Sequence, residues 1–370
     1  MISKNSLKNL KSVLTTYTQR NDTKAAVQTG LTIIPIVFLW YCAIKTVSVS
    51  YWVSGAFVLL LSLFLLRAFV LMHECGHGSL FKNPAYNMGF GFLFGVLTGM
   101  PQYVWSKHHA YHHATNGNWT KYRGPLSTLS TEEFSKLSRV QQSAYQYKRH
   151  MVVAPMGGFM YLIFNPRCTW LVGSVFLLIH IVKQKLRNNN QPISVLISNY
   201  PTRYWTTSKE YWHIFWNNIV LLSLWIVMIS WIGPIAFFTI YLISTSLAGA
   251  GGLILFTVQH NFEHSYASQD EGWDYDLAAL EGSSYLVLPK LLNWFTANIA
   301  YHHVHHLSAS IPNYHLARCH EDNKDSFKEV KRIHLTEIPF QLNHILWDKE
   351  NRRIISCGEY RQQQAALQNI

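Results

Sequence analysis

Long apolar runs constrain this chain more than any other feature of its sequence. Residues 25–47 and 51–72 each reach the roughly 20 residues that a membrane-spanning helix needs, and only the short step "SVS" separates them. A second pair of runs covers 214–232 and 235–258, with Gly233-Pro234 as the turn between them. Each pair therefore predicts a helical hairpin in a membrane.

Two further apolar stretches are too short for a usual span. The stretch "MGFGFLFGVLTGM" at 88–100 repeats glycine every fourth residue, at Gly91, Gly95 and Gly99, which predicts a flat face for close helix packing. Residues 152–164 and 169–182 are split by "NPR", so we expect them to lie in the interface or to form a short hairpin. The expected fold class is an all-α integral membrane protein with about four transmembrane helices plus interfacial or short re-entrant helices.

The composition supports a membrane location and argues against nucleic acid as a partner. Only 14% of the residues are charged, against a usual share of about 25%. The net charge is +12, but the lysines and arginines collect in loops beside apolar runs rather than on a basic helix. That distribution favours an anionic lipid surface. Five widely spaced cysteines form no C-x-x-C pair, which is typical of a reduced, cytosol-facing protein.

Histidines gather in four short windows of the sequence. They occur in "HECGH" at 73–77, "HHAYHH" at 108–113, "QHNFEH" at 259–264 and "HHVHH" at 302–306. Isolated histidines elsewhere need no function beyond anchoring at the interface; these are His150, His180, His213, His315, His320, His334 and His344.

The orientation of the chain follows from the distribution of its basic residues. Residues 1–24, 183–210 and the C-terminal tail are rich in Lys and Arg, whereas the connections 48–50 and 233–234 carry neither. The positive-inside rule then places both termini in the cytoplasm. The second helix of each hairpin returns to that side, so we expect all four histidine clusters to meet at the cytoplasmic face of the membrane, provided that 88–100 does not cross it.

The spacing inside the clusters indicates metal binding. Residues three or four apart share one helix face, so each cluster directs two or three imidazoles the same way. Imidazole is a neutral ligand suited to iron, zinc, copper and nickel. Nine or ten histidines exceed the coordination shell of one metal, and a site without thiolates favours two irons. The candidate ligands are His73, His77, His109, His112, His113, His260, His264, His302, His305 and His306.

Some neighbouring residues have alternative roles. His108 lies four residues before His112 and is an alternative ligand to His109, whereas His303 is expected to support a ligand rather than to bind metal. Acidic side chains orient metal-bound imidazoles through the other ring nitrogen, or they are simply solvated charges. The acidic candidates are Glu74, Glu263 and Asp274. Arg67 is expected to extend its head to the membrane interface.

At these residues the chain resembles the membrane fatty-acid desaturases, a family with three histidine boxes. The boxes here are "HECGH" at 73–77, "HAYHH" at 109–113 and "HHVHH" at 302–306, and their contexts are similar to the acyl-lipid, omega-6-type branch and its bacterial relatives. The resemblance covers about residues 30 to 320. It implies a desaturase domain at 25–320 between cytoplasmic segments 1–24 and 321–370.

The resemblance also implies a chemistry. In this family the boxes hold two irons together with histidines that follow the last transmembrane helix, a position that His260 matches well and His264 less securely. The implied reaction is the O2-dependent removal of two hydrogens from the acyl chain of a lipid. No "HPGG" haem segment is present, so electrons are expected from a separate carrier of the ferredoxin, flavodoxin or cytochrome b5 type. The expected location is a multi-pass protein of the plasma or inner membrane, if the source is bacterial.

Three alternatives remain open at this point. Alkane, carotenoid and sphingolipid-type hydroxylases share histidine-rich di-iron sites, and the context "HHAYHHATNGNW" favours desaturases over them. A metal transporter would bury ionisable residues at mid-membrane, whereas these histidines follow the spans. A zinc hydrolase needs about three protein ligands, fewer than the clusters supply.

Overall fold

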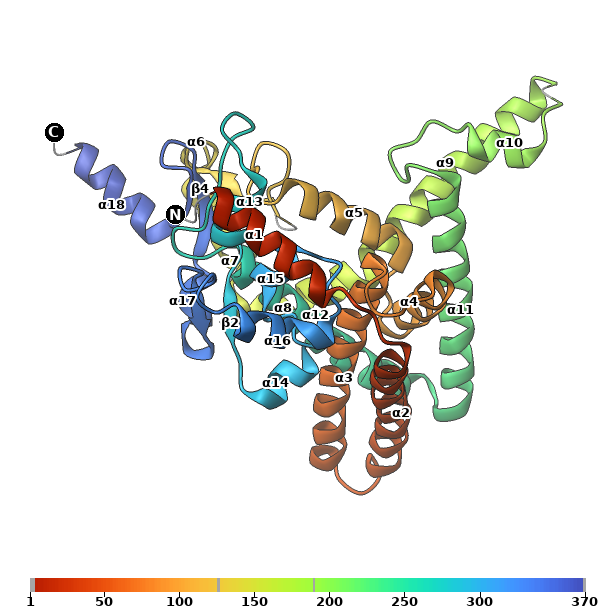
Figure 1. The fold of residues 1–370 in the computed structure, drawn as a ribbon. Coiled ribbons are helices and arrows are strands. Elements are labelled where there is room, and N and C mark those ends of the chain that lie inside the picture. Colours follow the sequence, from red (N-terminus) through yellow and green to blue (C-terminus); the bar gives the residue numbers. More distant parts are fainter. Residues whose placement is uncertain (1–3, 125–126, 189, 369–370) are drawn as a thin grey trace.

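The computed structural model describes residues 4–124, 127–188 and 190–368, and it is mostly helical (Figure 1). Five helical segments are long and apolar enough to cross a membrane. Four of them are the two predicted hairpins. The remaining one covers Met151–Leu186, where two shorter pieces were expected.

The predicted hairpins are present, and their second helices run on into the histidine clusters. Helices α2 (Asp22–Thr46) and α3 (Tyr51–His77) form the first, and α11 (Ser208–Ile232) and α12 (Pro234–His260) form the second. The side chain of Asn21 caps α2 by accepting a hydrogen bond from the backbone of Lys24 at 2.9 Å. Pro234 stands in the first turn of α12, where its missing N–H costs nothing.

The expected break at "NPR" is wrong. The chain continues from a 3-10 turn (Met151–Val153) through α8 (Ala154–Phe159) and a π-helical turn, η3 (Met160–Phe164), into α9 (Asn165–Leu186). A proline removes the hydrogen bond to the carbonyl four residues earlier, which is that of Leu162 for Pro166. Here that carbonyl accepts from the guanidinium of Arg167 at 3.1 Å instead. The π turn and this arginine therefore let one helix pass through the proline.

Helix α4 (Pro84–Thr98) is too short to cross, because 15 residues make about 22 Å of helix. As predicted, its glycines mark a close-packed face. A Cβ added at Gly91 would lie 3.0 Å from Cβ of Cys75, and one at Gly95 would lie 2.6 Å from the carbonyl oxygen of Met100. Gly99 has a different role, since its φ of +80° ends the helix. The chain then enters α5 (Gln102–Thr115), which carries the second cluster.

Helix α3 lies at the centre of the packed helices, and the main apolar core joins it to α2, α4 and α12. Helices α8 and α12 approach each other closely. A Cβ added at Gly158 would lie 2.3 Å from the backbone carbon of Gly249, so the two backbones are in direct contact. Glycine is required at both positions for this approach.

A cap of short elements covers the ends of α3 and α12. It contains α13 (Tyr275–Glu281), α14 (Lys290–Phe295), α15 (His302–Leu307) and α16 (Asn313–Asp322). The C-terminal tail contains strands as well as short helices. Strands β4 (His344–Asp348) and β5 (Arg353–Ser356) form an antiparallel pair, and β1 (Leu129–Ser130) adds to β4 in parallel. A second parallel pair joins β2 (Tyr285–Val287) to β3 (Arg332–His334).

The tail strands hold the cap together because β4 is buried along its whole length. The indole of Trp347 donates to the carbonyl of Ala267 at 3.1 Å, which ties the tail to the segment after α12. The remaining elements are α1 (Lys4–Leu14), η1 (Thr15–Tyr17), α6 (Thr131–Ser135), α7 (Arg139–Tyr147), α10 (Ile193–Ser198), η4 (Leu335–Glu337), α17 (Ile338–Gln341) and α18 (Cys357–Gln368).

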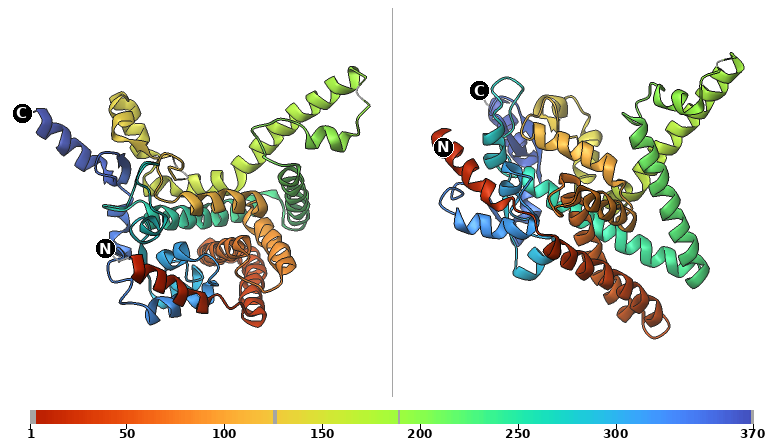
Figure 2. Two further views of the ribbon diagram at one scale, coloured as in Figure 1. Left: turned by 45° about the horizontal axis from the view of Figure 1, so that its top comes forward. Right: turned by 45° about the vertical axis from the view of Figure 1, so that its right-hand side comes forward.

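The molecule has a helical part and a cap at one end of it. The described ends of the chain lie on the side of the cap, away from the turn between α2 and α3 (Figure 1). Helices α9 and α10 extend away from the rest in both further views (Figure 2). The four histidine clusters lie where the cap meets the helical part.

Candidate metal centre

The first cluster occupies the last turn of α3. His73 and His77 share one helix face, and their ring centroids are 4.7 Å apart. The helix ends directly after them because Gly78 adopts a left-handed conformation, with φ of +67°, and its N–H bonds back to Cys75 and Glu74. Gly78, the last residue of "HECGHG", thus ends the helix with both imidazoles in its last turn.

Three other elements supply the remaining imidazoles. Helix α5 contributes His109, His112 and His113, and the short helix α15 contributes His302, His305 and His306, as the spacing predicted. His260 is the last residue of α12. All of these side chains are buried.

The imidazoles form two adjoining groups. Within each group, the candidate ligand atoms all lie within 4.8 Å of one another. The two groups meet where the rings of His113 and His306 stack at a centroid distance of 4.2 Å. The first group consists of His73, His77, His109, His113 and His305, and the second of His112, His260, His302 and His306.

The distances between ring nitrogens fit a shared metal. A metal–imidazole bond is about 2.1 Å long, so two ligands at right angles have nitrogens about 3.0 Å apart. In the first group, Nε2 of His113 lies 3.0 Å from Nε2 of His109 and 3.1 Å from that of His305. In the second, Nε2 of His260 lies 3.1 Å from Nε2 of His112 and 2.9 Å from that of His302. Each group thus presents a set of converging nitrogen donors.

The protonation state also suits a metal. Burial, the largest cause, and neighbouring imidazoles together hold the pKa of each histidine on α5 and α15 that belongs to a group well below its ordinary value of 6.5. These residues are His109, His112, His113, His302, His305 and His306. They are therefore neutral near pH 7, which is the form that binds metal.

The hydrogen bonds of two ligands fix which nitrogen is free. Nδ1 of His73 lies 3.1 Å from a carboxylate oxygen of Glu74, and Nδ1 of His260 lies 3.0 Å from the carbonyl of Gly282. A carboxylate or carbonyl accepts a hydrogen bond from a protonated Nδ1, which leaves the lone pair on Nε2. Nε2 of His73 and of His77 is buried and has no hydrogen-bond partner among the described residues, as expected of a nitrogen that ligates a metal.

Glu74 belongs to a polar network that reaches across the molecule. Its other oxygen accepts from the hydroxyl of Ser79 and from the backbone N–H of Asn313, both at 2.9 Å. The side chain of Asn313 donates to Gln28 on α2 at 2.7 Å, and the same Gln28 oxygen accepts from Arg67 at 3.1 Å. The first cluster is therefore anchored to α2 and α16 as well as to α3.

Other candidates from the sequence lie outside the two groups. His264 follows the end of α12, is exposed and bonds to Arg353 at 2.7 Å, so the expected ligand pair with His260 does not form. His108 is exposed and does not replace His109. His303 is buried and faces away from the groups, since its Nε2 lies 2.9 Å from Nδ1 of His320.

Two acidic candidates also have other partners. Glu263 is half-buried and pairs with Lys331 at 3.7 Å. Asp274 caps α13 by accepting from the backbone N–H groups of Asp276 and Leu277 at 2.9 Å. Of the three acidic residues expected to orient an imidazole, only Glu74 contacts one of the grouped histidines among the described residues.

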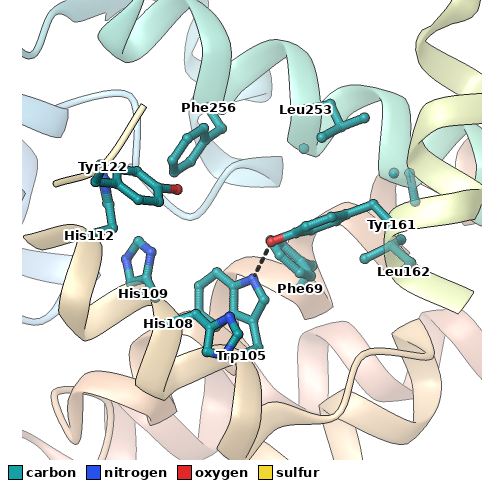
Figure 3. Close-up of a pocket in the computed structure, with 13 residues that line it drawn as sticks. Phe69, Trp105, His108, His109, His112, Tyr122, Tyr161, Leu162, Leu253 and Phe256 are labelled. Atoms are coloured by element: carbon teal, nitrogen blue, oxygen red, sulfur yellow. Dashed lines mark hydrogen bonds between the residues drawn. The ribbon is translucent and has the colours of Figure 1, made fainter. Parts of the chain in front are cut away.

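An apolar cavity adjoins the groups on the side of α12. It has a volume of about 70 Å³ and is lined by His109 and His112 from α5 and by residues of α3, η3 and α12. Figure 3 shows the two imidazoles at one end and the aromatic rings of Trp105, Tyr161 and Phe256 around the space. The indole of Trp105 donates to the hydroxyl of Tyr161 at 2.9 Å, which joins α5 to η3.

Sequence reasoning missed two residues of this region, Asn313 and His320, and placed a third, Arg67, wrongly. Asn313 is reached by a backbone bond, which no side-chain pattern reveals, although it lies in the stretch "SIPNY" beside the last cluster. His320 was set aside as isolated because its partner His303 lies 17 residues away. The expectation that Arg67 extends to the interface is wrong, since this side chain is only 2% exposed.

Comparison with known proteins adds an independent finding. A family model described as "Fatty acid desaturase" matches residues 50–337. A "Fatty acid desaturase" of Bacillus subtilis (strain 168) is 33% identical over 350 residues, which are 94% of this chain and 90% of that protein. The "sn-1 oleoyl-lipid 12-desaturase" of Anabaena variabilis is 23% identical over 67% of this chain and 62% of that protein. The "Omega-3 fatty acid desaturase, endoplasmic reticulum" of Vigna radiata var. radiata is 24% identical over 69% of this chain and 60% of that protein.

Proposed function

The chain belongs to the fatty acid desaturase family, and we propose that it introduces a double bond into an acyl chain of a membrane lipid by using two iron ions, O2 and electrons from a separate protein. It is a membrane fatty-acid desaturase and hence an oxidoreductase. The observation that carries the finer proposal is the pair of converging histidine groups beside an apolar cavity.

We assign the five histidines of the first group to one iron and the four of the second group to the other. The support is threefold: nitrogens at the spacing of neighbouring ligands, buried atoms without partners, and neutral imidazoles. Among the described residues neither group contains a cysteine or a carboxylate, so zinc of the structural, thiolate-bound type does not match the donor set. His264 is left out of the assignment because its side chain lies at the surface with Arg353.

When bound, the irons would supply the oxidant, since an unactivated methylene has no acidity that a side-chain base can use. The protein's own residues position the chain. The aromatic walls of the cavity, from Phe69, Trp105 and Phe256, exclude water and would hold a short stretch of the alkyl chain next to His109 and His112. The bond between Trp105 and Tyr161 fixes the width of this space.

We also propose that the metal centre, the cap and both termini face the cytoplasm, with Met151–Leu186 lying along the interface rather than crossing the membrane. The support is the excess of Lys and Arg in the segments on that side and their absence from 48–50 and 233–234. A cytoplasmic centre is accessible to a soluble electron donor of the ferredoxin or flavodoxin type, or to cytochrome b5. Reporter fusions after residues 114 and 270 should then report the same side, and opposite sides would refute this topology.

Expression in a host that makes mainly saturated and monounsaturated chains tests the function. Fatty-acid methyl ester analysis should find a new double bond in membrane lipids, formed only with O2 and iron. Anaerobically purified protein should hold close to two iron equivalents. Hydroxylated products without a new alkene, or one zinc per chain and no iron-dependent activity, would refute the proposal.

A further inference from the structure

A polar cleft separate from the apolar cavity lies between the start of α2, α14 and α16. It has a volume of about 660 Å³. Its lining includes the cations Lys24, Arg67 and Lys290, together with Asn293 and Tyr314. No Asp or Glu lies among the lining residues in the described part of the chain, so the lining itself carries a net positive charge.

The charge at the base of the cleft is unusual. Arg67 stands within the membrane-spanning helix α3 and is only 2% exposed, yet it has no carboxylate partner among the described residues. Its guanidinium stacks on the ring of Trp294 at 4.0 Å and donates to Thr32 and Gln28, both at 3.1 Å, and to the carbonyl of Trp294. A buried cation is costly unless it is paired, and neutral acceptors offset only part of that cost.

The two lysines stand at the opening of the cleft. Lys24 and Lys290 are exposed, and no ion pair is formed by either within the described residues. They belong to the start of α2 and the start of α14, so two separate elements direct positive charge to one place. Asn293 adds a buried side-chain oxygen that has no hydrogen-bond partner in the described part of the chain and is suited to a hydroxyl or ammonium donor.

The depth of the cleft matches the phosphate layer of a membrane. Arg67 precedes His73 by six residues, which is about 9 Å along the helix. The cleft therefore opens at the end of the helical part where the cap begins, next to the level at which the lipid head groups lie. Clustered basic residues at this level attract anionic lipid.

We propose that this cleft binds the phosphate of an anionic glycerophospholipid, with Lys24 and Lys290 contacting the phosphate and Arg67 supplying buried charge beneath it. The inference rests on the proposed function and names the head group of its lipid substrate. The network from Arg67 through Gln28 and Asn313 to Glu74 places the cleft and the first histidine group on one scaffold. A lipid held by its phosphate would then present its chains at a fixed distance from the metal centre.

Calorimetric titration of the full chain in neutral detergent tests the site directly. The probes are dihexanoyl phosphatidylglycerol, the phosphate-free dihexanoylglycerol and inorganic phosphate. The double variant Lys24→Gln with Lys290→Gln should bind the phospholipid roughly tenfold more weakly, since each exposed charge pair contributes modestly. The matched control, Lys324→Gln with Lys328→Gln, removes two exposed lysines of the same cap and should bind like the wild type.

Each result has a definite meaning. Phosphatidylglycerol that binds far more tightly than dihexanoylglycerol, with weakening only in the cleft variant, supports the proposal. Inorganic phosphate that binds as tightly as the phospholipid would overturn the assignment to a lipid. Equal binding of both lipids, or an unaffected cleft variant, would overturn the role of the charges. A wild type that desaturates lipid but fails to bind the probe defeats this inference alone, whereas one that binds but makes no double bond defeats the proposed function.

Discussion

The replacement Glu74→Gln isolates the one acidic contact of the histidine groups while keeping the side-chain volume. Glu74 is completely buried, and three donors surround its carboxylate. One oxygen accepts from Ser79 and from the N–H of Asn313, and the other faces Nδ1 of His73 at 3.1 Å. A glutamine has one oxygen and one NH2 group, so it cannot accept from both sides.

The geometry decides how the amide orients. Its oxygen should turn to Ser79 and Asn313, because the reverse orientation leaves the N–H of Asn313 without an acceptor, at about 1–3 kcal/mol, whereas the Ser79 hydroxyl also donates to the backbone carbonyl of Glu74 at 3.0 Å. The NH2 group then faces Nδ1 of His73, which must become the acceptor. The ring proton moves to Nε2, the atom that would bind metal. His73 can then ligate through Nε2 only if the new hydrogen bond from the amide to Nδ1 breaks and the proton returns to Nδ1.

We expect the Glu74→Gln protein to bind iron about 10- to 100-fold more weakly, which corresponds to roughly 1.4 to 2.7 kcal/mol. Anaerobic competition with a chromophoric chelator measures this affinity, and the melting temperature of the metal-free protein reports separately on folding. The matched control is Glu263→Gln, a half-buried glutamate outside both groups, which should bind iron like the wild type. Wild-type iron affinity in Glu74→Gln would refute the assignment of the His73 tautomer and of this contact.

Three more predictions concern ligands, packing and pH. His305→Ala should lose iron and activity, whereas the exposed His334→Ala should keep both by metal analysis and lipid profiling. Gly158→Ala should lower the melting temperature through a loss of about 1–3 kcal/mol, because its Cβ would meet the backbone of Gly249, while Gly55→Ala, with nothing within 4 Å, should not. Below about pH 6.5 the unfolded chain takes up protons that the buried histidines on α5 and α15 do not. The free energy of unfolding of the metal-free protein should therefore fall with pH, by up to about 1.4 kcal/mol per such histidine per pH unit, and its melting temperature should fall with it. A flat melting-temperature profile down to about pH 5 would contradict the lowered pKa values.

Local patterns in the sequence predicted the parts of the site that are local in the structure. The four long helices and the shared faces of the clusters follow from runs and spacings that one helix contains. The meeting of the clusters was predicted because two hairpins return their second helices to one side. His260 was found in this way, whereas His264 was not excluded, because the end of α12 depends on contacts beyond the pattern.

Features that depend on distant partners could not be predicted in the same way. The carbonyl of Leu162, left unpaired by Pro166, is satisfied by Arg167, and this bond lets the helix continue where a break was expected. Arg67 was expected at the interface because its acceptors on α2 and α14 are invisible to a local pattern. The tail strands were missed because β1 and β4, which pair, lie far apart in the sequence.

The two histidine groups also determine when, during synthesis of the chain, a metal can bind. His113 and His305 touch although 192 positions separate them, and His112 and His260 touch across 148. At about 5–20 residues per second, the ribosome needs roughly 10 to 40 s to make the chain between the first of these pairs. Neither ligand set is complete until α15 has emerged, so a metal can meet a full set of ligands only late in synthesis or after it, once both hairpins have been inserted. Before that point the free imidazoles of α3 and α5 are accessible to other metals in the cell. The correct metal must therefore compete with these metals, and it can bind a complete set of ligands only when translation is nearly finished.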